Sequence, residues 1–202
     1  MSIPVREEIE WVNFRWDHAP DVTRPRVLLI GDSIANGYHG VVSAQLQDRA
    51  NVDLLATSKR VGDPALLRET RFAMEEYEYA LIHFNNGLHG QHLADEGYES
   101  ALRDYARSLA ELAPESHLIW ASSTPRRNAE GALCPQRNAQ VKARNSLAAA
   151  IMTERRILID DLYSLVADRP ELFSADGVHY NDEGRAFLGE AVADLILKTL
   201  DK

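Results

Sequence analysis

Hydrophobic residues along the chain gather in five short runs, separated by longer stretches that mix polar and apolar positions. Each run is nearly continuous rather than alternating, a pattern typical of strands whose two faces are both covered by helices. The alternation of such runs with segments of helix length predicts a parallel sheet. The predicted strands are Arg26–Ile30, Val52–Ala56, Ala80–Phe84, His117–Ala121 and Ile157–Ile159.

The segments between these runs have helical spacing, because their apolar residues recur at intervals that share one face of a helix. We interpret these stripes as faces that pack on the core. The three sets are Leu66, Ala73 and Tyr77, then Tyr98, Leu102, Tyr105, Leu109 and Leu112, then Val141, Ala148, Ile151 and Met152.

The last helix has the clearest start. Asn181 is placed to cap it, and Asp182 and Glu183 follow in the first turn, where negative charge favours a helix N-terminus. Its buried stripe consists of Leu188, Val192, Leu195 and Ile196. The chain is therefore predicted to be an α/β protein, a three-layer α/β/α sandwich with a five-stranded parallel sheet in a flavodoxin-like arrangement. Right-handed crossovers in such a sheet place ligands at the carboxyl ends of the strands.

A length of 202 residues suits one domain of ordinary size, which we place at residues 26–202 after an N-terminal extension of residues 1–25. Hydrophobic residues make up 45% and charged residues 26% of the chain, a mixture typical of a soluble globular protein. Within the extension, Trp11, Phe14 and Trp16 are expected to pack on the domain, the alternative being a dimer contact. The oligomeric state stays open.

The net charge of −9 argues against nucleic-acid binding, which needs clustered lysine and arginine. The N-terminus has no apolar signal segment and no later run has membrane-spanning length, so we expect a cytoplasmic protein without a membrane partner. Cys134 is the single cysteine, which excludes an internal disulfide and a cysteine metal cluster. The histidines show no spacing with carboxylates that suggests a metal site.

Candidate chemistry begins directly after the first predicted strand, at Gly31-Asp32-Ser33-Ile34. A serine at this turn lies at the carboxyl edge of the sheet and at a helix N-terminus, where free N–H groups and the helix dipole stabilise developing negative charge. The alternative is an ordinary serine that caps the helix. The G-x-S-x-G turn of the α/β-hydrolases is absent, so that family is not the right comparison.

A second motif, Asp176-Gly177-Val178-His179, lies just before the last helix. A serine hydroxyl needs a base to remove its proton, and a histidine base needs a carboxylate to hold its other ring nitrogen. The short spacing lets Asp176 and His179 sit side by side within one loop. The alternative is that His179 only caps or packs the last helix.

Together, a G-D-S after the first strand and a D-x-x-H before the last helix resemble the first and last signature blocks of the SGNH/GDSL hydrolases, and the layout fits the chain from Arg26 onward. The resemblance implies a serine esterase without cofactor or metal, acting through an acyl-enzyme. Its catalytic triad is Ser33, His179 and Asp176. It also implies an oxyanion hole made by the serine N–H, a glycine after the second strand and an asparagine after the third.

Gly62 stands in the place of that glycine, just ahead of a helix. The third block departs from the family pattern G-x-N-D, since residues 84–90 read FNNGLHG. The segment resembles a branch of the family that reads N-x-G-L-H, on which Asn85 is the oxyanion donor and Asn86 the fallback. His89 is a candidate for substrate contact, with a structural histidine as the alternative.

The substrate is expected to be a small-molecule ester with a small acyl group, such as O-acetyl on a carbohydrate. Thioesters and lysophospholipids are the alternatives within the family, and a catalytically silent glycan or metabolite binder is the alternative outside enzymes. A nucleotide-binding or receiver domain lacks the phosphate-cradling glycine loop. Arg126 and Arg127, in the long loop after the fourth predicted strand, are the best candidates for contact with an anionic substrate, within a set of basic residues for which the solvated surface is the alternative. That set is Lys59, Arg60, Arg126, Arg127 and Arg137.

Overall fold

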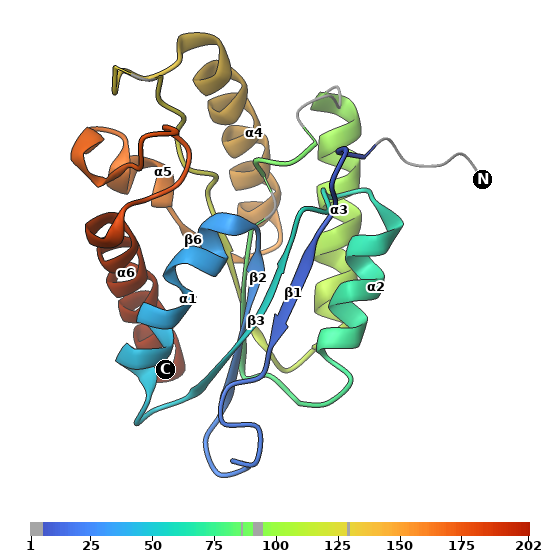
Figure 1. The fold of residues 1–202 in the computed structure, drawn as a ribbon. Coiled ribbons are helices and arrows are strands. Elements are labelled where there is room, and N and C mark those ends of the chain that lie inside the picture. The colour runs from blue at the N-terminus through green and yellow to red at the C-terminus, as the bar shows by residue number, and fades with distance from the viewer. Residues whose placement is uncertain (1–5, 86, 91–94, 129) are drawn as a thin grey trace.

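The computed structural model describes residues 6–85, 87–90, 95–128 and 130–202. A six-stranded sheet runs through the middle of the molecule, with helices on both of its faces (Figure 1). The strands are β1 Val12–Arg15, β2 Arg26–Gly31, β3 Asn51–Thr57, β4 Leu81–Phe84, β5 His117–Ala121 and β6 Leu158–Asp160. The helices are α1 Ser33–Leu46, α2 Pro64–Ala73, α3 Asp95–Leu112, α4 Pro135–Glu154, α5 Leu162–Val166 and α6 Asp182–Leu200, with a 3₁₀ turn at Pro170–Leu172.

The five predicted strands are confirmed, and all of them pair in parallel. The strand order in the sheet is β1-β3-β2-β4-β5-β6. The chain thus leaves β2 towards β3 on one side and later returns to add β4 on the other side. A crevice forms outside the carboxyl end of the central strand where the winding reverses in this way. Ser33 follows that end of β2 directly.

A sixth strand corrects the prediction of a five-stranded, wholly parallel sheet. β1 pairs with β3 in antiparallel register from Val12 opposite Thr57 to Arg15 opposite Leu54, so the sheet is mixed. Part of the predicted extension therefore belongs to the sheet. β1 was missed because it is an edge strand with mostly exposed side chains and has no continuous apolar run.

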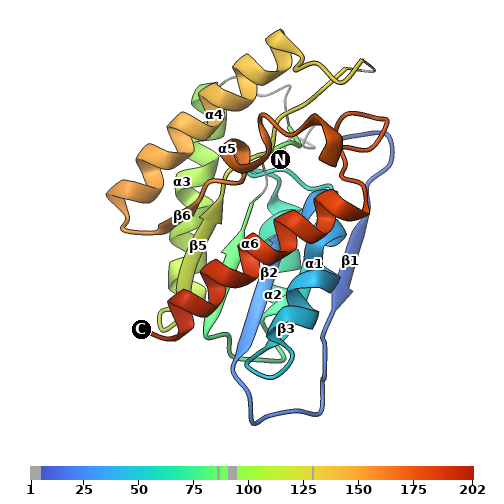
Figure 2. The same ribbon diagram turned by 90° about the vertical axis from the view of Figure 1, so that its left-hand side faces the viewer.

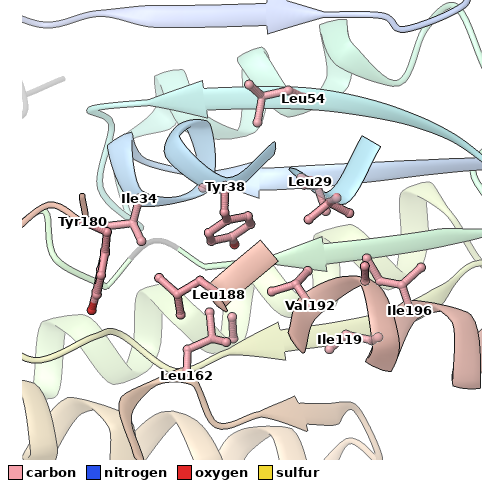
Figure 3. Close-up of a cluster of buried hydrophobic side chains, with 14 of the residues drawn as sticks. Leu29, Ile34, Tyr38, Leu54, Ile119, Leu162, Tyr180, Leu188, Val192 and Ile196 are labelled. Carbon is pink, nitrogen blue, oxygen red and sulfur yellow. The ribbon is translucent and has the colours of Figure 1, made fainter. Parts of the chain in front are cut away.

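Alternate residues of each strand supply two cores, one on each face of the sheet. Leu29 of β2 faces the layer formed by α1 and α6 (Figure 3), and Figure 2 shows these two helices side by side on one face of the sheet. Leu28 faces the opposite layer, where α2, α3 and α4 pack. The first core includes Ile34 and Tyr38 from α1 together with buried residues of α6, which fixes the helix that begins with Ser33 firmly on the sheet.

Most helix predictions are confirmed, including the stripes of α3 and α4. Asn181 caps α6, since its Oδ1 accepts a hydrogen bond of 2.9 Å from the Gly184 N–H. Tyr77 lies beyond α2, which ends at Ala73. Trp11 and Phe14 pack against the two cores from their edges, as expected for this part of the chain. Among the described residues, no helix combines the length and the apolar character needed to cross a bilayer.

Candidate active site

Ser33 is the first residue of α1, and the residue before it takes the capping role. The Asp32 side chain is buried, and its Oδ1 accepts a hydrogen bond of 2.9 Å from the Ile34 N–H. Because Asp32 caps the helix, the Ser33 hydroxyl is free for other partners. This observation excludes the reading of Ser33 as an ordinary N-cap serine.

The Ser33 hydroxyl meets the loop that precedes α6. His179 Nε2 lies 2.8 Å from Ser33 Oγ, and His179 Nδ1 lies 2.6 Å from Asp176 Oδ2. The hydrogen-bond network assigns the proton on Nδ1 to the bond with Asp176, so that Nε2 accepts the serine hydroxyl. Two hydrogen bonds thus connect the three predicted side chains, from the Asp176 carboxylate to the His179 imidazole and from the imidazole to the Ser33 hydroxyl.

The Asp176 carboxylate is held in its charged form. Its Oδ1 accepts hydrogen bonds of 2.9 Å from the N–H groups of Val178 and His179. Partial burial on its own raises the pKa of Asp176, but the hydrogen bonds from His179 and from these N–H groups outweigh it and lower the pKa to about 2. A carboxylate in this state fixes the imidazole tautomer and stabilises an imidazolium.

The backbone of the loop depends on Gly177. Its φ of 68° lies in the left-handed region, and a Cβ atom at this position would fall 2.3 Å from the Arg127 carbonyl oxygen. The Gly177 carbonyl in turn accepts a hydrogen bond of 2.7 Å from the Arg127 N–H. This close approach seats the segment between Asp176 and His179 against the loop that follows β5.

The Arg127 side chain also stabilises this part of the structure. Its guanidinium points inward, donates to the carbonyl oxygens of Gly131 and Ala167, and lies 4.8 Å from the centre of the Phe173 ring. The Phe173 ring packs at a tilt of 41° against Tyr180, the residue after His179, with the ring centres 4.6 Å apart. The sequence suggested Arg127 as a contact for an anionic substrate or as a surface cation, and it did not predict this role, because the partners of the guanidinium are backbone groups that no local pattern reveals.

Asn85 lies near Ser33, but its amide already has partners. It lines a cavity of about 10 Å³ together with Asp32. Its Nδ2 donates to the Ala121 carbonyl at 2.6 Å and to Ser123 Oγ at 3.4 Å, and its Oδ1 accepts from the Gly87 N–H at 2.9 Å. The amide hydrogens are therefore aimed at protein acceptors. Asn86, the fallback, is outside the described residues.

Gly62 occupies a different environment. It has a φ of 82° in the turn before α2, and it lines a groove of about 450 Å³ with Leu66, Ala101 and Tyr105 between α2 and α3. Gly62 is not among the described residues that line the cavity beside Asp32. The described contacts thus connect Asn85, and not Gly62, with the surroundings of Ser33.

Comparison with known proteins identifies the fold. No protein-family model and no curated protein sequence matches the chain. Its structure resembles a GDSL-like lipase from Bacteroides thetaiotaomicron, with a TM-score of 0.65, 16% identity, and 86% of this chain and 88% of the other covered. An acetylxylan esterase from Geobacillus stearothermophilus has a TM-score of 0.69 and 17% identity over 84% and 93% of the two chains. The lipase/acylhydrolase from Enterococcus faecalis gives 0.68 and 17%, over 85% and 95%.

The chain has the SGNH/GDSL hydrolase fold. This confirms the predicted resemblance at the level of architecture. At these identities the likeness concerns the fold, so any statement about chemistry depends on the residues of this chain. In the SGNH/GDSL fold of this protein, the acid, imidazole and hydroxyl meet at the carboxyl end of β2, where the winding of the sheet reverses.

His89 contacts the N-terminal segment of the chain. Residues 6–10, here called the N-terminal strap, are tied by ion pairs to the loops after β3 and β4. Glu7 Oε1 lies 2.7 Å from His89 Nδ1. The strap makes two further pairs: Arg6 with Asp63 at 2.8 and 3.0 Å, and Glu10 with Lys59 at 2.5 Å. Lys59 is thus paired within the protein rather than a free rim cation.

A larger hollow of about 780 Å³ lies far from the serine, at the amino end of the sheet, beside Arg26 and Tyr79. Its described lining residues include no histidine to activate a nucleophile. The candidate active site of this SGNH/GDSL fold is therefore assigned from the hydrogen-bonded side chains of Ser33, His179 and Asp176, and not from cavity size.

Proposed function

We propose that this protein is a serine hydrolase of carboxylic esters, with Ser33 as nucleophile, His179 as general base and acid, and Asp176 as the carboxylate that orients the imidazole. The observation that carries the proposal is the pair of contacts from His179, 2.8 Å to Ser33 Oγ and 2.6 Å to Asp176 Oδ2. Both lie within the reach that proton transfer requires. The SGNH/GDSL fold supports the same reaction class.

In the proposed reaction, Ser33 Oγ attacks the ester carbonyl carbon while its proton passes to His179 Nε2. The tetrahedral intermediate collapses, the bond from carbon to the leaving oxygen breaks, and His179 returns the proton to the leaving alcohol. An acyl group then remains on Ser33. A water molecule attacks this acyl-enzyme with His179 again as base, which releases the acid and restores the serine.

The negative charge on the tetrahedral oxygen needs donors. The Ser33 N–H belongs to the first turn of α1, where N–H groups have no intrahelical partner and the helix dipole favours negative charge. One such donor contributes about 3 kcal/mol to transition-state stabilisation in other hydrolases. Asn85 remains the proposed side-chain donor, and it takes this role by turning its amide away from the Ala121 carbonyl. The role of Gly62 stays a prediction that its described contacts do not support.

We propose a small acyl group, such as acetyl, for the substrate. Beside the start of α1, the cavity that Asp32 and Ile34 share with Asn85 and Thr124 measures about 10 Å³, so this cavity has room for about one water molecule and does not accept a fatty acyl chain. The likeness to an acetylxylan esterase favours an acetylated carbohydrate as the alcohol part. The likeness to a GDSL-like lipase and to a lipase/acylhydrolase makes a lipid ester the alternative, which the series of acyl chain lengths below tests.

A fluorophosphonate probe tests the nucleophile. We expect the wild type to be labelled covalently and Ser33→Ala to lose the label. Ser43→Ala is the matched control, because Ser43 lies in the same helix with its hydroxyl bonded to Asp17 at 2.7 Å. A wild-type protein that folds but takes no label contradicts the enzyme proposal and favours a silent binder of the same fold.

Acyl preference is tested with p-nitrophenyl esters of rising chain length. We expect kcat/KM to be highest for acetate or propionate and to fall for longer chains, which find no apolar pocket. If the site had a long acyl tunnel, kcat/KM would instead rise with chain length, since each buried CH₂ contributes about 0.8 kcal/mol. A maximum at eight carbons or more contradicts the proposed small acyl group.

A further inference from the structure

Arg126 lies between two parts of the candidate active site. Two residues before it, Thr124 lines the cavity that also contains Asp32. Directly after it, the Arg127 N–H is bonded to the Gly177 carbonyl inside the loop of Asp176 and His179. The position of Arg126 in the loop after β5 is therefore fixed from both sides at the carboxyl edge of the sheet.

The backbone of Arg126 is held rigidly by Asn138 from the first turn of α4. Asn138 Oδ1 accepts from the Arg126 N–H at 3.0 Å, and Asn138 Nδ2 donates to the Arg126 carbonyl at 2.6 Å. Asn138 is itself buried, with an exposed fraction of 4%. The Cys134 N–H also donates to the Arg126 carbonyl. Such a firmly placed backbone pre-organises the side chain it carries.

The Arg126 guanidinium lacks a hydrogen-bond acceptor and an acidic partner among the described residues. The side chain is partly buried, and Nε is shielded from solvent without a hydrogen-bond partner. Within the described parts of the chain, the guanidinium makes no ion pair and no hydrogen bond. Its neighbour Arg127 behaves differently, since two backbone carbonyls receive its guanidinium. The shielding concerns Nε alone, and the terminal nitrogens of Arg126 stay accessible, so they can donate to an anion from outside.

The charges around Arg126 also favour the binding of an external anion. Burial lowers the pKa of Arg126, and the nearby positive charge of Arg137 lowers it further, while the charges of Asp32 and Glu7 oppose both effects only in part. One of these opposing charges, Asp32, belongs to the residue that caps the helix of Ser33. A bound anion near Arg126 and Arg137 removes the mutual repulsion of the two cations.

We propose that Arg126 forms an anion subsite beside Ser33, so that the ester hydrolysed by this protein carries a carboxylate or phosphate group. The inference rests on the proposed esterase function and narrows its substrate class. A guanidinium presents parallel N–H donors that match the two oxygens of a carboxylate or phosphate. The protein has a net charge of −9, so its overall field repels anions and the attraction has to be local.

The test compares acetyl esters that differ only in charge: methyl 4-acetoxybenzoate as the neutral ester, 4-acetoxybenzoate as the carboxylate and 4-acetoxyphenyl phosphate as the phosphate. For each enzyme variant, the ratio of kcat/KM for the charged ester to kcat/KM for the neutral ester is measured. Differences in leaving-group reactivity cancel when these ratios are compared between variants. Comparing the ratio for the carboxylate ester with the ratio for the phosphate ester then shows which anion the subsite prefers.

We expect Arg126→Gln to lower this ratio at least tenfold for one of the two anions, mainly through KM. Arg126→Lys retains the charge but not the parallel donors, so it should lower the ratio less than Arg126→Gln does. Arg71→Gln is the matched control, since Arg71 is exposed in the last turn of α2, and it should leave the ratio unchanged. A folded Arg126→Gln variant with an unchanged ratio overturns the proposal, and a thermal melt of each variant checks that it is folded.

A direct binding measurement separates failure of the subsite from failure of the esterase function. Isothermal titration with benzoate and with inorganic phosphate is made on the wild type and on Arg126→Gln. Binding by the wild type that weakens at least tenfold in the variant supports the subsite even if no ester is hydrolysed. If neither anion binds the wild type more tightly than Arg126→Gln, the subsite is refuted whatever the activity.

Discussion

At the scale of single residues, the candidate site depends on which side chain takes which hydrogen bond. Asp32 caps α1 and so leaves the Ser33 hydroxyl to His179. Asp176 uses one oxygen for two backbone N–H groups and the other for the imidazole. The carboxylate thus shapes its own loop and orients the base at the same time. One acidic residue therefore couples the local backbone geometry to the chemistry.

Replacing Asp176 with asparagine tests this coupling. We expect kcat to fall by roughly 10³ to 10⁴, because the imidazole loses its orienting carboxylate and its preferred tautomer. The measurement is steady-state hydrolysis of p-nitrophenyl acetate at pH 7, and the control is Asp182→Asn, which changes an exposed acid three residues after His179. A fall of less than tenfold contradicts a triad role for Asp176.

Asp176 should also make the stability of the folded state depend on pH. The folded protein lowers the pKa of Asp176 from 3.8 to about 2, so the ionised carboxylate stabilises the folded state above pH 3.8. This contribution is lost as the pH falls from 3.8 towards 2. The stability difference between wild type and Asp176→Asn should therefore narrow between pH 6 and pH 3 in urea unfolding. A constant difference shows that the carboxylate charge does not stabilise the loop.

Gly177 allows a matched pair of substitutions. Gly177→Ala places a methyl group 2.3 Å from the Arg127 carbonyl oxygen, whereas Gly131→Ala meets its first neighbour only at 4.0 Å, although both glycines have positive φ. Both variants carry the cost of a left-handed alanine, about 1 kcal/mol. We expect only Gly177→Ala to lose at least tenfold in kcat/KM, because it displaces the loop of Asp176 and His179. Equal losses in the two variants argue against the close approach.

At the scale of elements, the loops at the carboxyl edge are held by segments remote in sequence. The strap of residues 6–10 reaches the loops after β3 and β4 through Arg6, Glu7 and Glu10. β1 follows it and adds to the sheet edge beside β3. The N-terminal part of the chain thus supports the edge on which the candidate site is built.

The strap is tested by Arg6→Gln, which removes the partner of Asp63. The Asp63 side chain is 1% exposed and caps α2, so the carboxylate is left with fewer charge partners in a buried place. We expect lower stability in urea unfolding at low salt and a smaller effect at 1 M salt, which screens the interaction. The control is Arg49→Gln, whose partner Asp201 is exposed. Equal effects of the two substitutions contradict a supporting role of the strap.

At the scale of the whole molecule, stability and chemistry lie at opposite ends of the sheet. At the amino end of β2, the Arg26 guanidinium contacts Asp53 at 2.7 and 2.8 Å, and the Tyr79 hydroxyl donates to the same carboxylate at 3.0 Å. Asp53 is fully buried, and burial raises its pKa while the charge of Arg26 opposes this. The hydrogen-bonded side chains of Ser33, His179 and Asp176 lie beyond the carboxyl end of the same strand.

Asp53→Asn should lower the stability of the protein without changing the activity at the opposite end of the sheet. We expect a loss of about 3 to 5 kcal/mol in unfolding free energy, because Arg26 is left as an uncompensated buried charge. The kcat/KM per folded molecule should stay within twofold of the wild type, since the change is remote from Ser33. Asp48→Asn, at an exposed position, serves as control for the lost charge. A large change in kcat/KM without a loss of stability contradicts this separation.

Much of the architecture could be predicted from local patterns. The apolar runs of β2 to β6, the stripe of α3 and the cap at Asn181 each depend on residues close in sequence, and each is present in the structure. The pairing of Asp176 with His179 is equally local, because three positions within one turn bring them together. Short-range patterns such as these reflect backbone propensity and burial, which act before any distant contact forms.

Other features were decided only when the chain folded. The edge strand β1 has little apolar pattern, and the unpartnered guanidinium of Arg126 and the inward turn of Arg127 depend on partners from other loops. The 2.8 Å contact between Ser33 and His179 joins residues 146 positions apart. Residue types and spacing by themselves determined which groups were available for chemistry. Their convergence, and the direction in which each side chain points, followed from tertiary structure, because packing of the whole sheet sets distances that no local rule encodes.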